Sequence, residues 1–207
     1  MVGKPGECLY DSSMKRIVIL YTSLPPLLAL RLAVVYALKK LLNSEASINY
    51  SQTGEDAVIR SLLDETRPGV YVDVGCNDPI RSSNTLSLYL HGWHGVNVGK
   101  WRKRGERMVK TGTLDSMLQE HLPAGTEIDL LSVDVEGHDL NVLRSVDLDT
   151  LRPKLIVVEM HHLDLNRSLE SPITHYLQER EFRHVGYDTL NGYLVDARAP
   201  RAGLRLP

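Results

Sequence analysis

The sequence predicts an α/β protein built on a mostly parallel sheet. Short apolar, β-branched runs such as GVYVDVG (Gly69–Gly75) and KLIVVE (Lys154–Glu159) alternate with segments whose apolar residues recur at helical spacing. Strands that alternate with helices form βαβ units, and the helices then cover both faces of the sheet. Two last expected strands, FRHVGY and GYLVD, are joined by a turn containing Asn191-Gly192, which predicts a C-terminal antiparallel hairpin.

Each expected element has its own signal. In SQTGEDAVIRSLLDE, Thr53 is placed as an N-cap, and Glu55 and Asp56 in the first turn favour the positive end of a helix dipole. Ser171-Pro172 opens another helix with an N-cap and a first-turn proline. The remaining expected elements are helices at 84–92, 113–122 and 138–146 and strands at 95–98 and 128–135.

Composition limits the class of protein. The chain has 207 residues, 43% hydrophobic and 24% charged, as in a soluble globular protein, which excludes a disordered chain and a polytopic membrane protein. A sequence pI of about 6.4 argues against a nucleic-acid partner. The two cysteines, Cys8 and Cys76, are too few for a disulfide framework or a four-thiolate zinc site, although one disulfide stays open.

An apolar segment precedes the α/β pattern. Residues 17–38 contain one charge, Arg31, and are flanked by basic residues on both sides, which gives no orientation by the positive-inside rule. Pro25-Pro26 would break or kink a helix in this run. Two interpretations stay open: a membrane anchor or interfacial helix, or a packing element of a soluble, cytoplasmic protein. We therefore expect an N-terminal extension at 1–47, a domain at 48–198 and a tail at 199–207.

Ligands of open parallel sheets bind beyond the carboxyl ends of the strands. Asp73 closes one strand, and Gly75 would permit a sharp turn and close approach of a ligand. A G-x-G-x-x-G turn is absent here, which argues against a dehydrogenase. From spacing alone, Asp73 is equally well explained as a residue that caps the following turn.

A second candidate group follows the strand at 128–135. Asp134 and Glu136 would share one face if the strand continued through them, and His138 is a candidate base. Helix capping explains these acids equally well. His161-His162 with Asp164 lacks a firm ligand spacing, so no metal site is predicted, and the basic run Lys100–Lys110 is interpreted as a solvated loop.

These motifs together resemble the FkbM family of methyltransferases. The resemblance rests on SQTGED, on GVYVDVGCNDPIRSSNTLSLYLHGWHGVNV, on TLDSMLQEHLP, and on IDLLSVDVEGHDLNVLRSVDLDTLRPKLIVVEMH with the C-terminal hairpin. It covers most of the chain from about Tyr50 to Asp196.

The resemblance implies a Rossmann-like fold whose last strand is antiparallel, and S-adenosylmethionine as cofactor. It implies a methyl acceptor that is the hydroxyl of a small molecule or glycan. The cofactor would contact Asp73, Gly75, Cys76 and Asn77, with Asn84 and the Gln52–Asp56 segment, including Glu55, around the same pocket. Asp134, Glu136 and His138 would face the reaction as catalytic residues.

The chain departs from the family after the strand GVNV. Family members there carry an acidic residue for the ribose hydroxyls, whereas Gly99 follows here. The next landmark, TLDSML, begins too soon for the usual helix and third strand, a stretch on the order of 50 residues, because one crossover alone needs at least about a dozen. We therefore expect the third-strand region to be missing. The alternative function is a catalytically impaired, membrane-tethered or free, binding module of this fold.

Overall fold

The computed structural model describes residues 26–42, 48–64, 66–76, 78, 80–99, 112–160, 171–198 and 204–205. The chain divides into two compact units. One comprises residues 1–48 with 90–92, and the other comprises residues 49–89 with 93–207.

The first unit contains helix α2, Pro26–Leu41. The helix begins at the second residue of Pro25-Pro26, where a proline lacks only an N–H that the first turn would leave unpaired. Pro26 is therefore accommodated as the first residue of α2. Within the described ranges, no helix combines the length and apolar character needed to cross a membrane.

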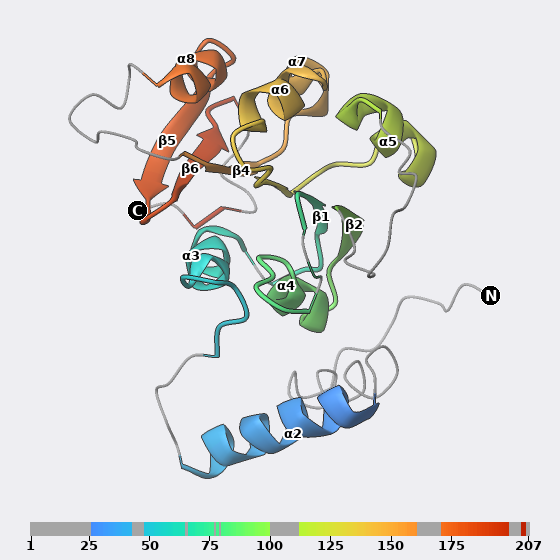
Figure 1. Ribbon diagram of the computed structural model, residues 1–207, viewed down its shortest axis with the longest axis vertical. Coiled ribbons are helices and arrows are strands. Elements are labelled where there is room, and N and C mark those ends of the chain that lie inside the picture. The colour runs from blue at the N-terminus through green and yellow to red at the C-terminus, as the bar shows by residue number, and fades with distance from the viewer. Residues whose placement is uncertain are drawn as a thin grey trace. The chain divides into compact units, whose positions relative to one another are not determined.

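A six-stranded sheet forms the centre of the second unit (Figure 1). Its order is β2-β1-β3-β4-β6-β5, and β6 is antiparallel to both of its neighbours. The strands are β1 (Val70–Val74), β2 (His94–Val98), β3 (Leu130–Val133), β4 (Leu155–Glu159), β5 (Phe182–Tyr187) and β6 (Asn191–Asp196). This arrangement confirms the predicted Rossmann-like α/β fold with an antiparallel C-terminal hairpin.

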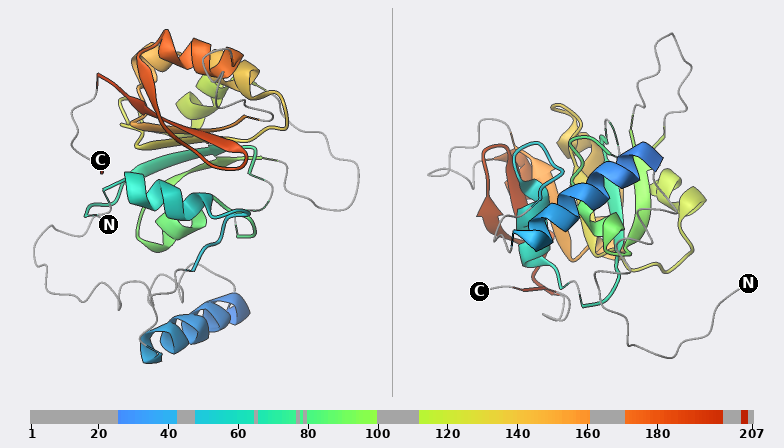
Figure 2. Two further views of the ribbon diagram at one scale, coloured as in Figure 1. Left: turned by 90° about the vertical axis from the view of Figure 1, so that its left-hand side faces the viewer. Right: turned by 90° about the horizontal axis from the view of Figure 1, so that it is seen from below.

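Helices cover both faces of this sheet (Figure 2). On one face lie α3 and α4, and on the other lie α5, α6, α7 and α8. Their bounds are α3 (Glu55–Leu62), α4 (Leu86–Leu90), α5 (Leu114–His121), α6 (Asp139–Arg144), α7 (Leu148–Leu151) and α8 (Pro172–Gln178).

Alternation along the buried strands supplies one apolar core to each face. Val70, Val72 and Val74 of β1 pack with α5–α8, whereas Tyr71 packs with α3, α4 and Trp93. All residues of β1, β3 and β4 are buried, as expected for central strands of a sheet covered on both faces.

Strand β2 differs from these central strands. Its residues are exposed or half-buried, and β1 is its only strand neighbour among the described residues. Strand β2 therefore forms an edge of the described sheet, as expected if the third-strand region is missing.

The structure corrects three local predictions. The N-cap of α3 is Gly54 instead of Thr53, because the Thr53 hydroxyl donates to Glu55 Oε1 at 2.7 Å. Asn191-Gly192 lies in β6, and the turn before it is held by Asp188 Oδ1, which accepts from the N–H groups of Leu190 and Asn191. Helix α7, which was not predicted, is a four-residue helix capped by Asp147.

A buried carboxylate, that of Asp129, connects the parallel strands at the edge of the sheet where they begin. Asp129 Oδ2 accepts the N–H of Val70 at 2.9 Å, and Asp129 Oδ1 lies 2.5 Å from Lys154 Nζ and 3.0 Å from an Arg67 nitrogen. Asp129 is 4% exposed. One side chain thereby joins the starts of β1, β3 and β4.

Replacing Asp129 by alanine is expected to lower the free energy of unfolding by about 2 to 4 kcal/mol, because Lys154 and the Val70 N–H lose a buried partner. Urea denaturation measures this loss. Glu127→Ala is the matched control: Glu127 reaches the same Lys154 at 3.9 Å but is exposed, so its removal should cost less than about 0.5 kcal/mol. Equal losses for both variants would contradict the assignment.

Candidate functional site

Three polar side chains form one row near the carboxyl ends of β2, β1 and β3. Asp73 of β1 is in register with Asn97 of β2 on one side and with Ser132 of β3 on the other. Asp73 and Ser132 are buried, and Asn97 is exposed at the sheet edge. Strand β2 pairs with one side of β1, and the next strand along the chain, β3, pairs with the other side. This row therefore lies at the topological switch point, where open α/β sheets bind ligands.

The segment that starts α4 closes over this row. Thr85 Oγ1 donates to Asp73 Oδ2 at 3.0 Å and lies 3.4 Å from Asn97 Oδ1. Asn84 Nδ2 donates to Ser132 Oγ at 3.3 Å. Two consecutive residues therefore hold all three strands.

Burial changes the acidity of two groups here. It raises the pKa of Asp73 to about 6, the Thr85 hydrogen bond opposes this shift, and the neighbouring charge of Asp134 adds to it. Burial, with the charges of Asp73 and Asp78, raises the pKa of the Cys76 thiol to about 12. At neutral pH Asp73 is mostly a carboxylate, whereas Cys76 is a protonated thiol and not a nucleophile.

Two glycines allow loops at this edge to approach closely. Gly75 has φ +100°, and a Cβ there would lie 1.6 Å from the carbonyl oxygen of Asp134. A Cβ on Gly99 would lie 1.8 Å from the carbonyl oxygen of Cys76. The loops after β1, β2 and β3 are therefore packed backbone to backbone, and the group that approaches Gly75 closely is the Asp134 carbonyl.

The predicted catalytic residues Asp134, Glu136 and His138 all lie on the loop after β3, and all three are exposed. The assumption that Asp134 and Glu136 alternate on one strand is wrong. Strand β3 ends at Val133, and Glu136 has φ +54° in a turn.

The cause of this turn is Asp139 at the start of α6. Its buried carboxylate accepts the N–H of Val135 at 3.0 Å and the N–H of Gly137 at 3.1 Å. Asp139 therefore orders the loop before α6, whose N-cap residue His138 makes no side-chain capping hydrogen bond, and Asp134 and Glu136 are exposed on that loop.

The residues expected around the pocket from the Gln52–Asp56 segment have different surroundings. Gln52 is exposed, whereas Glu55 is buried and accepts from the Thr53 N–H at 2.8 Å, the Thr53 hydroxyl and Asn191 Nδ2. Burial by itself would raise the pKa of Glu55, but these hydrogen bonds outweigh it and lower the pKa. Glu55 thus ties α3 to the start of β6, a connection that sequence reasoning did not predict.

Other predictions fall outside the described residues: Asn77, the basic run at 100–110, and the His161-His162 and Asp164 group. Within the described part of the chain, no group of three or more His, Cys, Asp or Glu side chains could hold a metal ion.

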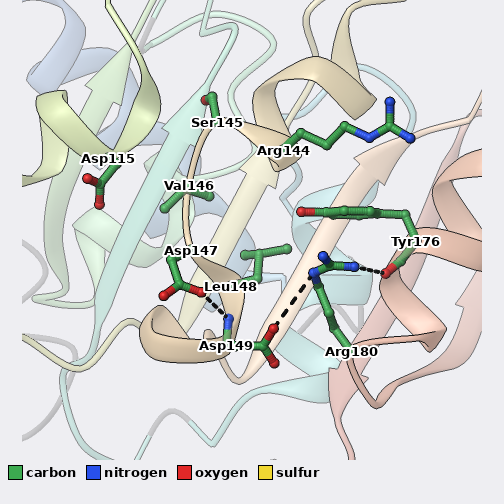
Figure 3. Close-up of a pocket in the computed structure, with 9 residues that line it drawn as sticks. All are labelled: Asp115, Arg144, Ser145, Val146, Asp147, Leu148, Asp149, Tyr176 and Arg180. Atoms are coloured by element: carbon green, nitrogen blue, oxygen red, sulfur yellow. Dashed lines mark hydrogen bonds and ion pairs between the residues drawn. The ribbon is translucent and has the colours of Figure 1, made fainter.

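A groove of about 360 Å³ lies elsewhere, among the helices α5 to α8 (Figure 3). Arg180 stacks on the Tyr176 ring at 3.8 Å from its centroid, and Arg144 lies 5.7 Å from the same centroid. Arg180 is also 3.9 Å from Asp149. The groove contains both charge signs and none of the predicted site residues, so it provides no argument for one ligand class.

Sequence reasoning missed Thr85, Asn97 and Ser132 as partners of the site. A signal existed for the two strand residues, since each is a polar residue inside an otherwise apolar strand, GVNV or LLSV. Their register with Asp73 requires the strand pairing, which the sequence alone does not specify.

The raised pKa of Asp73 predicts a pH-dependent gain in stability for Asp73→Asn. A folded pKa of about 6, against an ordinary value near 4, means that the charged form destabilises the folded state as the pH rises through 6. At pH 7.5 the variant should therefore be more stable by about 1 to 3 kcal/mol, and the difference should vanish below about pH 4. Urea denaturation across this range measures it.

Asp147→Asn is the control with the opposite sign. Hydrogen bonds from Thr150 and Asp149 lower the pKa of Asp147, so its charged form stabilises the fold. This variant should be less stable at neutral pH, and the difference should shrink as the pH falls through the carboxyl pKa. The same sign for both variants would refute the assigned environment of Asp73.

Gly75→Ala tests the close approach of the loops. The added Cβ meets the Asp134 carbonyl and also strains a residue at φ +100°, so we expect a loss of at least about 3 kcal/mol in unfolding free energy. Gly137→Ala has a similar φ of +87° but nothing within 4 Å, and should lose only about 1 to 2 kcal/mol. Comparable losses would show that backbone strain alone acts at Gly75.

Comparison with known proteins gives one match. Residues 100–187 match the family model of the methyltransferase FkbM domain. No curated protein and no solved structure matches the chain. The matched residues include β3, β4, β5 and the helices between them, so the resemblance that the sequence motifs predicted is confirmed for this part of the fold. Residues 100–187 are therefore similar to the methyltransferase FkbM domain.

Proposed function

We propose that this protein uses S-adenosylmethionine to methylate a hydroxyl group of a small molecule or glycan. The observation that carries the proposal is the buried Asp73 carboxylate next to Gly75, at the switch point between β1 and β3. Burying this carboxylate lowers the stability of the fold. A destabilising charged group at the ligand-binding edge of a sheet is typical of a functional residue.

The described residues fit the amino-acid end of this cofactor. That end carries an ammonium group, and Asp73 and the exposed Asp134 bring two carboxylates to adjacent strand ends. Gly75 has no side chain, so the backbone of the loop after β3, which begins with Asp134, lies directly against it and beside Asp73. Asn84, which contacts Ser132, would border the same position.

When bound, S-adenosylmethionine supplies an electrophilic methyl group on a sulfonium. The residues of this chain would have to orient the acceptor hydroxyl and accept its proton. Asp134, Glu136 and His138 are exposed on one loop beside Gly75, and each side chain can accept a proton. We assign the proton-accepting role to this loop.

Strand β2 at the edge of the described sheet favours a second function, that of a non-catalytic binding module. Strand β2 is exposed, and Gly99 stands where a carboxylate for the ribose hydroxyls is expected. A domain with this edge could keep the fold without catalysis and bind a partner. The two functions differ in one measurable property, which is affinity for the cofactor.

Calorimetric titration of the full chain with S-adenosylmethionine tests the proposal. We expect binding, and we expect Asp73→Ala to weaken it at least about tenfold because a charged partner of the ammonium group is lost. Asp147→Ala is the control. Asp147 is the N-cap of α7 and lies far from Asp73 in the sequence, so the affinity of this variant for the cofactor should equal that of the wild type.

Each outcome has one meaning. No heat of binding at millimolar cofactor would refute the enzyme and leave the binding module. Binding that Asp73→Ala leaves unchanged would refute the site. Circular dichroism of both variants confirms that the comparison is made on folded protein.

A further inference from the structure

Helix α2 carries an apolar surface that the rest of the described chain lacks. Seven large hydrophobic residues are strongly exposed among the described residues, and all belong to α2 or directly follow it. They are Leu27, Leu30, Val34, Val35, Leu38, Leu41 and Leu42, with exposed fractions of 45 to 80%. Exposed apolar surface of this extent indicates a binding surface.

These side chains form one stripe. The spacing from Leu27 to Leu30, Val34, Leu38 and Leu41 is three, four, four and three residues, which places them on one side of a helix. The residues between these positions are less exposed: Ala29 is buried, and Leu28, Leu32, Ala33 and Tyr36 are partly buried. The helix can therefore offer one long side to a partner.

The charges around the stripe are all basic. Between Pro26 and Leu42 the sequence contains Arg31, Lys39 and Lys40 and no acidic residue. Arg31 and Lys40 are exposed, and Arg31 lies one helical turn from Leu27 and from Val35. A long arginine side chain can lie along an apolar surface while its charge reaches the polar layer above it.

The whole N-terminal unit shows the same bias. Residues 1–48 contain six Lys and Arg against three Asp and Glu, whereas residues 49–207 contain 18 against 23. The protein is near neutral overall, but its charge is divided into a basic N-terminal part and an acidic domain. The partner of this stripe should therefore have an apolar interior that contacts the stripe and a negatively charged layer that contacts the basic residues.

We propose that α2 lies in the surface of an anionic lipid membrane, with the Leu27–Leu41 stripe among the acyl chains. Arg31 and Lys40 contact the phosphate groups of the lipids. Affinity for a membrane surface grows with the apolar area buried and with attraction between basic residues and anionic lipids, and α2 supplies both. The one-sided exposure of the stripe orients the helix along the surface.

Vesicle flotation of the full chain tests this proposal. One set of vesicles contains phosphatidylcholine with about 30% phosphatidylglycerol, and the other contains phosphatidylcholine alone. We expect the protein to float with the anionic vesicles, and to bind severalfold more weakly when the salt is raised to about 0.5 M. The Leu30→Gln/Val34→Gln variant should bind at least about tenfold more weakly, because it loses apolar area at the centre of the stripe.

Two further variants separate the contributions. Arg31→Gln/Lys40→Gln should reduce the preference for anionic vesicles severalfold. Ala124→Gln/Ala197→Gln adds the same number of glutamines at exposed positions of the second unit and should bind like the wild type.

Three results would overturn the proposal. The first is no flotation with anionic vesicles, and the second is unchanged flotation of Leu30→Gln/Val34→Gln. The third is a dimer in light scattering that this variant dissociates while the wild type ignores vesicles, because a second copy of the chain would then cover the stripe. The glutamine variants alter exposed residues, and circular dichroism verifies their helix content.

Discussion

The hydrogen bond from Thr85 to the buried Asp73 is the interaction on which the candidate site depends. It fixes the start of α4 against β1 at the carboxyl edge of the sheet, and Asn84 extends the contact to β3. A carboxylate with 5% exposure loses most of its hydration, and one hydroxyl does not replace it. The raised pKa of Asp73 is the sign of this imbalance. The fold therefore holds an anion where parallel sheets receive ligands, at a cost that packing elsewhere must offset.

Three other buried carboxylates have hydrogen-bond partners that hold elements of the fold together. Asp129 joins three strands at the opposite edge, Asp139 closes the loop before α6, and Glu55 connects α3 with β6. In each, the carboxylate accepts hydrogen bonds within the chain and so contributes to the fold. Glu55, which was predicted as a cofactor contact, thus also has a structural role in the contact between α3 and β6.

The sequence predicted the strands well because buried parallel strands are continuous apolar runs, as in GVYVDVG and KLIVVE. It failed where one side chain decides the backbone. The Asp139 carboxylate turns the chain at 135–137, so Glu136 leaves the strand, and Asp188 holds the turn that had been assigned to Asn191-Gly192. Local hydrogen bonds of this kind compete with regular structure and are not visible in periodicity. The contact of Thr85 with Asp73 and Asn97 could not be predicted from the sequence for another reason. It depends on the register of two strands and on the position of a helix.

The exposed edge at β2 bears on both proposed functions. Strands β1 and β3 are fully buried, so Asp73 and Ser132 lie on central strands of the sheet. Strand β2 has its only described strand partner in β1, and its Asn97 is exposed although it contacts Thr85. A ligand over β1 and β3 would lie on buried strands, whereas one that extends over β2 would lie on an edge of the described sheet, where the strand is followed by Gly99. Under the proposed function, the described residues that would contribute most to binding are Asp73 and those of the loop after β3. Loss of Asp73 should accordingly remove most of the affinity for an amino-acid-bearing cofactor instead of a minor part.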